Sequence, residues 1–262
     1  MTAWTHLIRF VALEDGNVYL GQLVDTTRDV GLDSVNSVEI KAFIIIGDVF
    51  TGTVAESIRT VAKEAGMAIP TEIEVFAKPR TTLTGPYPAP VTIPKCAQDG
   101  TSDYEAELCI VIGKTGRDIP EDQALDHVLG YTAANDVSAR TLQLATKQWC
   151  FGKGLDNSCP IGPVLVSKAA LKKPGSLGIK AIYNNQTVQD SNTSNMIFSV
   201  QQQIASLSRG TTLEAGTIIL TGTPAGIGFF RKPRVTLEDG GRIDVYIDQI
   251  GTLVNQVKFE SC

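Results

Sequence analysis

Alternating apolar and polar positions predict β-strands along much of this chain. Residues 7–11 and 18–23 alternate in this way on either side of a turn signal at residues 14–17, so a β-hairpin is expected there. Residues 103–113 predict a buried strand, because bulky and β-branched side chains continue to a terminating glycine. Further strands are expected over residues 42–46, 131–134, 217–221, 242–247 and 251–259, with a second hairpin over residues 181–188.

Helical periodicity occurs in three stretches. Residues 54–65, 118–130 and 193–208 repeat apolar side chains every three or four positions and end at or near a glycine, and Thr193 is the expected N-cap of the third helix. Residues 149–163 are rich in glycine and proline and predict a loop. A proline-rich stretch over residues 70–100 marks a boundary, so we expect a small N-terminal unit (residues 1–70) and a larger domain (residues 71–262).

Composition narrows the function classes. The 262 residues carry a net charge of −5 and no block of Lys or Arg, which argues against nucleic acid or an anionic membrane as the main partner. The apolar runs are too short to span a bilayer, and the N-terminus lacks the pattern of a secretory signal. The five cysteines are scattered without a C-x-x-C pair, as expected for reduced thiols in a cytoplasmic protein.

Two glutamates in the predicted strand 103–113 are the first candidates for chemistry. Glu105 and Glu107 are two positions apart, so their side chains lie on one face of the strand. Two like charges at the edge of a core repel each other unless a positive group lies between them, and carboxylate oxygens suit Mg²⁺, Mn²⁺ or Ca²⁺. The alternative is a solvated strand end that pairs with Lys or Arg. Asp136, after another short strand, is the best third ligand, although a turn or N-cap aspartate would fit the same position.

Longer motifs around these acids resemble one enzyme family. They occupy residues 103–108, 130–140, 152–163 and 221–228, with shorter matches at 192–198 and 250–255. From about residue 79 to residue 257 the chain closely resembles the fumarylacetoacetate hydrolase family, and it is most similar to the smaller acylpyruvate hydrolase and oxaloacetate decarboxylase type. The resemblance implies a strand-rich α+β fold whose catalytic domain is a mixed β-sandwich roll, and it implies a homodimer.

The resemblance also implies a metal site. A divalent cation, usually Mg²⁺ or Mn²⁺ and exchangeable for Ca²⁺ in a crystal, would be held by Glu105, Glu107 and Asp136. Lys153 would lie beside the metal as a catalytic group and would bind the oxo-acid end of a small-molecule substrate. The cation would chelate and polarise a dicarbonyl or 2-oxo acid.

Three further polar residues are implied on the substrate side. Arg140 and Gln143 match substrate-side polar groups of the family, and Thr223 matches a contact to a substrate carboxylate or a metal-bound oxygen. If the family resemblance is set aside, Lys153 and Arg140 could equally well be charged residues at the surface. The loop over residues 221–228 is not a phosphate loop, because no Gly-Lys-Ser/Thr follows its glycines.

The N-terminal unit departs from the family pattern. Hydrolytic members carry a lid motif, Asn-Tyr-x-x-His-x-x-Glu, whose His and Glu activate water or move a proton. In the matching stretch of this chain Glu56 is present, but Thr53 stands in place of the histidine. Threonine does not titrate near neutral pH, and the two histidines of the chain, His6 and His127, are interpreted as structural. The catalytic candidates of the lid are therefore Glu56 and Thr53, which occupy the positions of the family's glutamate and histidine.

Three functions follow as expectations. The first is a metal-dependent enzyme that acts on a small enolisable dicarbonyl or 2-oxo acid, by hydrolysis of a C–C bond or by decarboxylation, with Glu56 or a metal-bound hydroxide as the base. The second is an isomerase, dehydratase or cyclase of a biosynthetic pathway on the same scaffold. The third is a non-catalytic relative that binds metal and ligand. The retained residues argue against it, namely Glu105, Glu107, Asp136, Lys153 and Thr223.

Overall fold

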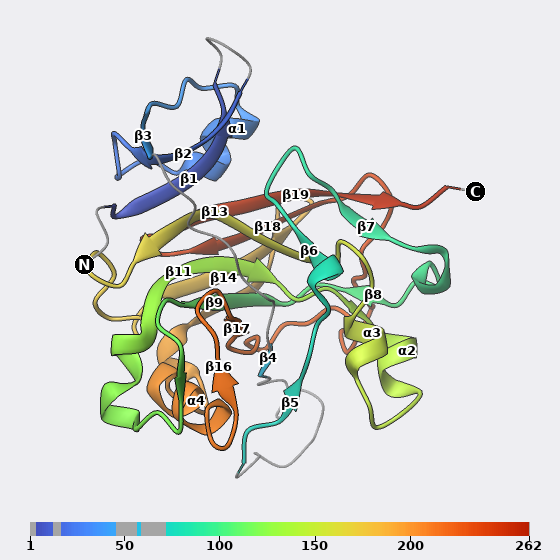
Figure 1. The fold of residues 1–262 in the computed structure, drawn as a ribbon. Helices are drawn as coiled ribbons and strands as arrows, with labels where there is room; N and C mark the ends of the chain where they lie inside the picture. The colour runs from blue at the N-terminus through green and yellow to red at the C-terminus, as the bar shows by residue number, and fades with distance from the viewer. Residues whose placement is uncertain (1–3, 13–16, 46–56, 59–71, 262) are drawn as a thin grey trace.

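Two β-sheets packed face to face make up the centre of the protein (Figure 1). The computed structural model describes residues 4–12, 17–45, 57–58 and 72–261. Within these residues the larger sheet has ten strands in the order β3-β2-β1-β13-β11-β9-β17-β4-β5, with β6 paired to β13. Its strands are β1 (His6–Val11), β2 (Val18–Leu23), β3 (Ala42–Ile45), β4 (Ser57–Ile58), β5 (Val75–Phe76), β6 (Leu83–Thr84), β9 (Ala106–Ile112), β11 (Val128–Asn135), β13 (Cys159–Ser167) and β17 (Ile218–Leu220).

The smaller sheet has five strands in the order β15-β14-β18-β19-β7. These are β7 (Val91–Ile93), β14 (Gly178–Tyr183), β15 (Gln186–Asn192), β18 (Arg242–Ile247) and β19 (Gly251–Phe259). Two short strand pairs join β8 (Ser102–Asp103) to β12 (Ser138–Ala139) and β10 (Gly116–Arg117) to β16 (Thr212–Leu213). The α-helices are α1 (Val30–Val35), α2 (Arg140–Leu144), α3 (Cys150–Lys153) and α4 (Val200–Leu207), and 3₁₀ turns cover Arg80–Thr82, Lys95–Ala97, Glu121–His127 and Thr193–Asn195.

The period of two along β9 separates two apolar clusters. Leu108, Ile110 and Ile112 face the smaller sheet and join the main core. Cys109 and Val111 point to the opposite face, where they pack in a second cluster. Every residue of β9 is buried, as predicted for a strand that is covered on both faces.

Strand pairing brings distant segments to one end of β9. β11 runs antiparallel to β9, with Asn135 opposite Ala106, so Asp136 follows directly beside Glu105. The backbone N–H of Asp136 donates to the carbonyl of Glu105 at 2.9 Å. On the other side of β9, β17 pairs Leu220 with Cys109 and leads into the loop over residues 221–228. Three segments, of which the first and the last are more than 110 positions apart in the sequence, therefore meet at one point.

The strand-rich α+β prediction is confirmed, and so are several of its parts. The first hairpin forms from β1 and β2. The second forms from β14 and β15 around Asn184 and Asn185, whose φ angles of 47° and 64° suit a tight two-residue turn. The strands expected over residues 242–247 and 251–259 are β18 and β19. No helix in the described part of the chain has the length and apolar character needed to cross a membrane.

The helix predictions are mostly wrong. Within the helix expected over residues 118–130, only Glu121–His127 are helical, as a 3₁₀ turn, because Val128 already pairs with Ile112 in the sheet. The helix expected over residues 193–208 begins only after Ser199, whose side chain forms a capping box with Gln202. The loop expected over residues 149–163 contains α3 and the start of β13.

One further helix prediction is contradicted where it can be compared. Ser57 and Ile58 form β4, whereas a helix was expected over residues 54–65. The remainder of that helix lies outside the described residues. The boundary between residues 70 and 71 stays a prediction.

Candidate active site

Three acidic side chains meet inside the protein at the end of β9. Oxygen atoms of Glu105, Glu107 and Asp136 lie within 4.8 Å of one another, and all three residues are buried. Glu105 immediately precedes β9, Glu107 is its second residue, and Asp136 immediately follows β11. The structure thus brings the three predicted residues together, and their role as metal ligands stays a prediction.

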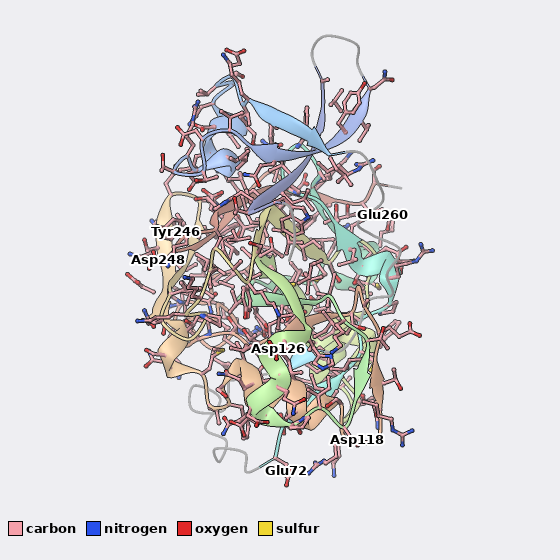
Figure 2. The ribbon with its side chains drawn as sticks, turned by 60° about the vertical axis from the view of Figure 1, so that its left-hand side comes forward. Glu72, Asp118, Asp126, Tyr246, Asp248 and Glu260 are labelled. Atoms are coloured by element: carbon pink, nitrogen blue, oxygen red, sulfur yellow. The ribbon has the colours of Figure 1, made fainter. Side chains whose placement is uncertain are left out.

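The acidic residues labelled in Figure 2 are distributed differently. Glu72, Asp118, Asp126 and Glu260 are exposed, and Asp248 is half-buried (Figure 2). A buried group of three carboxylates therefore differs in kind from the surface acids of this acidic chain.

Three buried cations surround the acidic triad. Nζ of Lys153 lies 2.8 Å from Oε2 of Glu105 and 2.5 Å from Oδ2 of Asp136. Nζ of Lys78 lies 3.0 Å from Oδ1 of Asp136 and also donates to the carbonyl oxygen of Lys153. Nη1 of Arg140 lies 2.6 Å from Oε1 of Glu105. The sequence prediction did not include Lys78, because a lysine between a strand and a proline has no local mark that distinguishes a buried lysine from a surface one.

Asp103 holds Arg140 in place and was also missed as a site residue. Its carboxylate accepts hydrogen bonds from Nε of Arg140 at 2.9 Å and from the backbone N–H groups of Gly228 and Phe229 at 2.8 and 3.0 Å. Burial would lower the pKa of Arg140, but the carboxylates of Glu105 and Asp103 raise it, so the guanidinium stays charged. Asp103 thus ties the loop over residues 221–228 to the charge network.

Glu107 is the least compensated member of the triad. Its Oε2 accepts a hydrogen bond of 2.5 Å from the backbone N–H of Gly222. Gly222 has a φ of 91°, a backbone conformation that strongly favours glycine. Another residue at this position would shift the backbone N–H that donates to Glu107. Burial, together with the charges of Asp136 and Glu105, raises the pKa of Glu107 well above its usual range.

The donor atoms fit a divalent cation. Oε1 of Glu107 and Oδ1 of Asp136 are buried and accept no hydrogen bond, since the contact of Lys78 with Asp136 is close in distance but lacks hydrogen-bond geometry. Buried carboxylate oxygens without hydrogen-bond donors are rare, because burying a charge without a partner costs several kcal/mol. Hard oxygen ligands at this spacing suit Mg²⁺, Mn²⁺ or Ca²⁺.

The other predicted site residues occupy supporting positions. Gln143 is buried, and its Oε1 accepts from Nη1 of Arg140 at 3.1 Å. The hydroxyl of Thr223 donates to the carbonyl of Ala106 at 3.0 Å and accepts from Nε2 of Gln189 at 2.7 Å, so it holds the loop against β9. Thr53 and Glu56 lie outside the described residues.

One of the two histidines that were interpreted as structural, His127, lies away from the carboxylates. His127 is 9% exposed, and its Nδ1 lies 2.8 Å from the carbonyl oxygen of Lys114. That contact is made in the 3₁₀ turn before β11, at the opposite end of the strand from Asp136.

Comparison with known proteins identifies relatives over almost the whole chain. The model of the fumarylacetoacetate (FAA) hydrolase C-terminal family matches residues 46–258. Caffeoylpyruvate hydrolase of Neonothopanus nambi is 40% identical over 292 aligned residues, which cover 99% of this chain and 95% of that protein.

Two further relatives differ in their named reactions. Oxaloacetate tautomerase YisK of Bacillus subtilis is 47% identical over 191 residues, which cover 72% of this chain but only 62% of that protein. The structure of fumarylpyruvate hydrolase from Pseudomonas aeruginosa, in complex with Mn²⁺ and pyruvate, matches with a TM-score of 0.71 and 30% identity over 84% of this chain and 92% of that chain. Hydrolases and a tautomerase thus share this fold.

Proposed function

The chain belongs to the fumarylacetoacetate hydrolase family, and we propose that it is a divalent-metal-dependent enzyme that hydrolyses the carbon–carbon bond of an acylpyruvate. The observation that carries the proposal is the buried triad of Glu105, Glu107 and Asp136, in which Oε1 of Glu107 and Oδ1 of Asp136 accept no hydrogen bond. Support also comes from the caffeoylpyruvate hydrolase, which is similar over nearly its full length, and from the structural relative that contains Mn²⁺ and pyruvate.

The charges of the site suit an anionic substrate once a divalent cation is bound. Among the described residues of the site, four buried carboxylates and three buried cations leave one formal negative charge, and a divalent cation makes this sum positive by one. The carboxylates belong to Asp103, Glu105, Glu107 and Asp136, and the cations to Lys78, Arg140 and Lys153. A 2-oxo acid is negatively charged, so it would be attracted to the loaded site and repelled by the empty one.

The proposed reaction breaks the bond between C3 and C4 of the acylpyruvate. Water adds its oxygen to C4, which leaves as a carboxylic acid, and C3 takes up a proton to give pyruvate. A bound divalent cation would supply the positive charge that stabilises the enolate character of the pyruvate part. Lys153 would donate an N–H of its ammonium group to the 2-oxo acid, since it already reaches two members of the triad. Glu56 is the proposed base for water.

The test is a product assay on purified protein. Acetylpyruvate and benzoylpyruvate would be incubated with chelator-treated protein, with and without Mn²⁺ or Mg²⁺, and pyruvate and the released acid would be measured. We expect stoichiometric formation of both products only with metal, and loss of turnover in Glu105→Ala. Full activity after chelation, or in Glu105→Ala, would contradict the metal-dependent mechanism.

A second candidate is the tautomerisation of an oxaloacetate-like acid. The observation that favours it is Thr53, which replaces the histidine of the hydrolytic lid motif, together with the similarity to an oxaloacetate tautomerase. The enol of oxaloacetate has a strong ultraviolet absorbance, so its loss without formation of pyruvate would identify this activity. Thr53→His then distinguishes the two, because a restored base should raise acylpyruvate hydrolysis and leave tautomerisation nearly unchanged.

The predicted homodimer remains part of the proposal. The outer face of the larger sheet carries an apolar hollow of about 390 Å³ whose lining includes Leu7, Val111, Leu165 and Ile218. We propose that a second copy of the chain covers it, as the resemblance implies. Light scattering at micromolar concentration measures the assembly directly, and a monomer would contradict this part of the proposal.

A further inference from the structure

Aromatic side chains lie beside the buried charges of the candidate site. The ring centroid of Phe76, in β5, lies 5.4 Å from Nζ of Lys153. The ring of Trp149 meets Phe76 edge to face, at 5.9 Å and 69°. Phe76 is 6% exposed, whereas Trp149 is half-buried. The two rings therefore form an apolar surface that runs from the buried ammonium group to the half-buried Trp149.

Trp149 is directed towards this surface by its position relative to Lys153. It precedes Lys153 by four residues, and the backbone N–H of Lys153 donates to the carbonyl of Trp149 at 3.1 Å, as in a helical turn. Residues four apart on a helix leave the same face. Phe151 lies two positions from each, so its side chain leaves the opposite face, and it is 65% exposed.

The segment that carries Trp149 is fixed at both ends to residues of the site. Gln143, in α2, is hydrogen-bonded to Arg140, and α3 ends at Lys153. A Cβ atom on Gly152 would lie only 2.5 Å from the backbone nitrogen of Gln143, so α2 and α3 touch there. The position of Trp149 is thus set relative to the carboxylates.

The chemistry of this segment favours an apolar occupant. Lys147 is the one charged residue among residues 144–152, and it is exposed. The buried cations nearby already pair with carboxylates of the site, through Lys153 with Glu105 and through Arg140 with Asp103. Among the described residues the second carboxylate of oxaloacetate would meet no unpaired buried cation here, whereas a large apolar group would lose contact with water by packing on the ring of Trp149.

We propose that the ring of Trp149, supported by the ring of Phe76, contacts the acyl substituent of the substrate and so determines specificity; we call these two rings the specificity wall. The enzyme would then select acylpyruvates with an aromatic or other large apolar acyl group. The inference rests on the proposed function and names its substrate class. The acid end would lie at Lys153, and the substituent would extend along the rings of Phe76 and Trp149.

The test compares a phenyl with a methyl substituent. With Mn²⁺ bound, we expect the wild-type kcat/KM to be about tenfold or more higher for benzoylpyruvate than for acetylpyruvate, a discrimination typical of apolar pockets. Trp149→Ala should lower the value for benzoylpyruvate about tenfold and the value for acetylpyruvate by less than about twofold. Trp149→Phe should retain most of the preference, and Phe151→Ala, on the opposite face, should leave both values unchanged.

Other outcomes separate this inference from the proposed function. An equal loss on both substrates in Trp149→Ala would show a merely structural role and overturn the inference, while hydrolysis itself would stand. If the wild type cleaves neither substrate, the proposed function fails. Tryptophan fluorescence then tests separately whether Trp149 contacts a bound acylpyruvate. The chain has two tryptophans, and Trp4 belongs to the separate apolar cluster on the outer sheet face. Benzoylpyruvate should quench the emission of the wild type and of Phe151→Ala but not of Trp149→Phe, and equal quenching in all three would overturn the wall.

Discussion

Nζ of Lys78 lies 3.0 Å from Oδ1 of Asp136, and both side chains are almost completely buried. The lysine lies in the segment that follows β5, which is distant in sequence from β9 and β11. Its positive charge therefore partly offsets the negative charge of the triad. Because its geometry is not that of a hydrogen bond, the oxygen keeps its lone pairs for another partner.

Lys78→Met should destabilise the metal-free protein. Removing one partner of a buried ion pair leaves an uncompensated charge, and we expect the free energy of unfolding to fall by about 3 kcal/mol. Part of this loss should return when Mn²⁺ is added, because the cation supplies positive charge at the same carboxylates. Urea unfolding with and without Mn²⁺ measures both effects. Lys180→Met, which removes an exposed ion pair with Asp190 at 3.1 Å, is the matched control and should change stability by less than about 1 kcal/mol. An unchanged Lys78→Met protein would contradict this role.

Glu107→Gln separates the charge of the triad from its shape. Glutamine keeps the size of the side chain and removes one of three like charges in a buried cluster, so the metal-free protein should be as stable as the wild type or more stable. Mn²⁺ should raise the melting temperature of the wild type and leave that of Glu107→Gln nearly unchanged. Glu72→Gln alters an exposed residue and should retain the full shift. An undiminished Mn²⁺ shift in Glu107→Gln would remove this residue from the ligand set.

Gly222→Ala tests the backbone donor that orients Glu107. The φ of 91° is unfavourable for alanine, so we expect a loss of about 1–2 kcal/mol in stability and weaker Mn²⁺ binding, because the N–H would move away from Oε2. Gly240 has a similar φ of 76° and open space around it, so Gly240→Ala introduces comparable strain away from the site. Titration calorimetry should show weaker Mn²⁺ binding only for Gly222→Ala. Equal Mn²⁺ affinity in the two variants would mean that this donor does not orient a ligand.

Thiol labelling tests the packing on the outer face of β9. Burial raises the pKa of Cys159 to about 12 and that of Cys109 well above its usual range, whereas Cys96 and Cys150 are exposed. At pH 8 the two buried thiols should hold almost no thiolate, so among the four described cysteines iodoacetamide should modify only Cys96 and Cys150 in the native protein. A rise to pH 9 should still leave Cys109 and Cys159 unmodified. Rapid native labelling of Cys159, read by peptide mass spectrometry, would contradict the described packing.

The convergence of the triad could be predicted from the sequence because it depends on simple rules. A period of two places Glu105 and Glu107 together, and a second strand that ends at Asn135 delivers Asp136 beside them. The hairpin at Asn184 was equally local, since asparagine tolerates the positive φ angles of a tight turn. The family motifs supplied the candidate role of Lys153.

Other parts of the fold depend on long-range contacts that no local pattern carries. Residues 121–129 have helical spacing, but Val128 gains more by pairing with β9, so the strand displaces the last helical turn. Lys78 and Asp103 are site residues only because the fold buries them against Asp136 and Arg140. The wall formed by Phe76 and Trp149 joins segments that are 73 positions apart, and neither segment predicts the other.

Crystals soaked in Mn²⁺ test the central claim most directly. Anomalous scattering locates the ion independently of any assumption about its ligands. We expect a single strong peak with oxygen atoms of Glu105, Glu107 and Asp136 at about 2.0–2.6 Å, the range of hard divalent cations. A peak elsewhere on the protein, or none between these three carboxylates at saturating Mn²⁺, would contradict it.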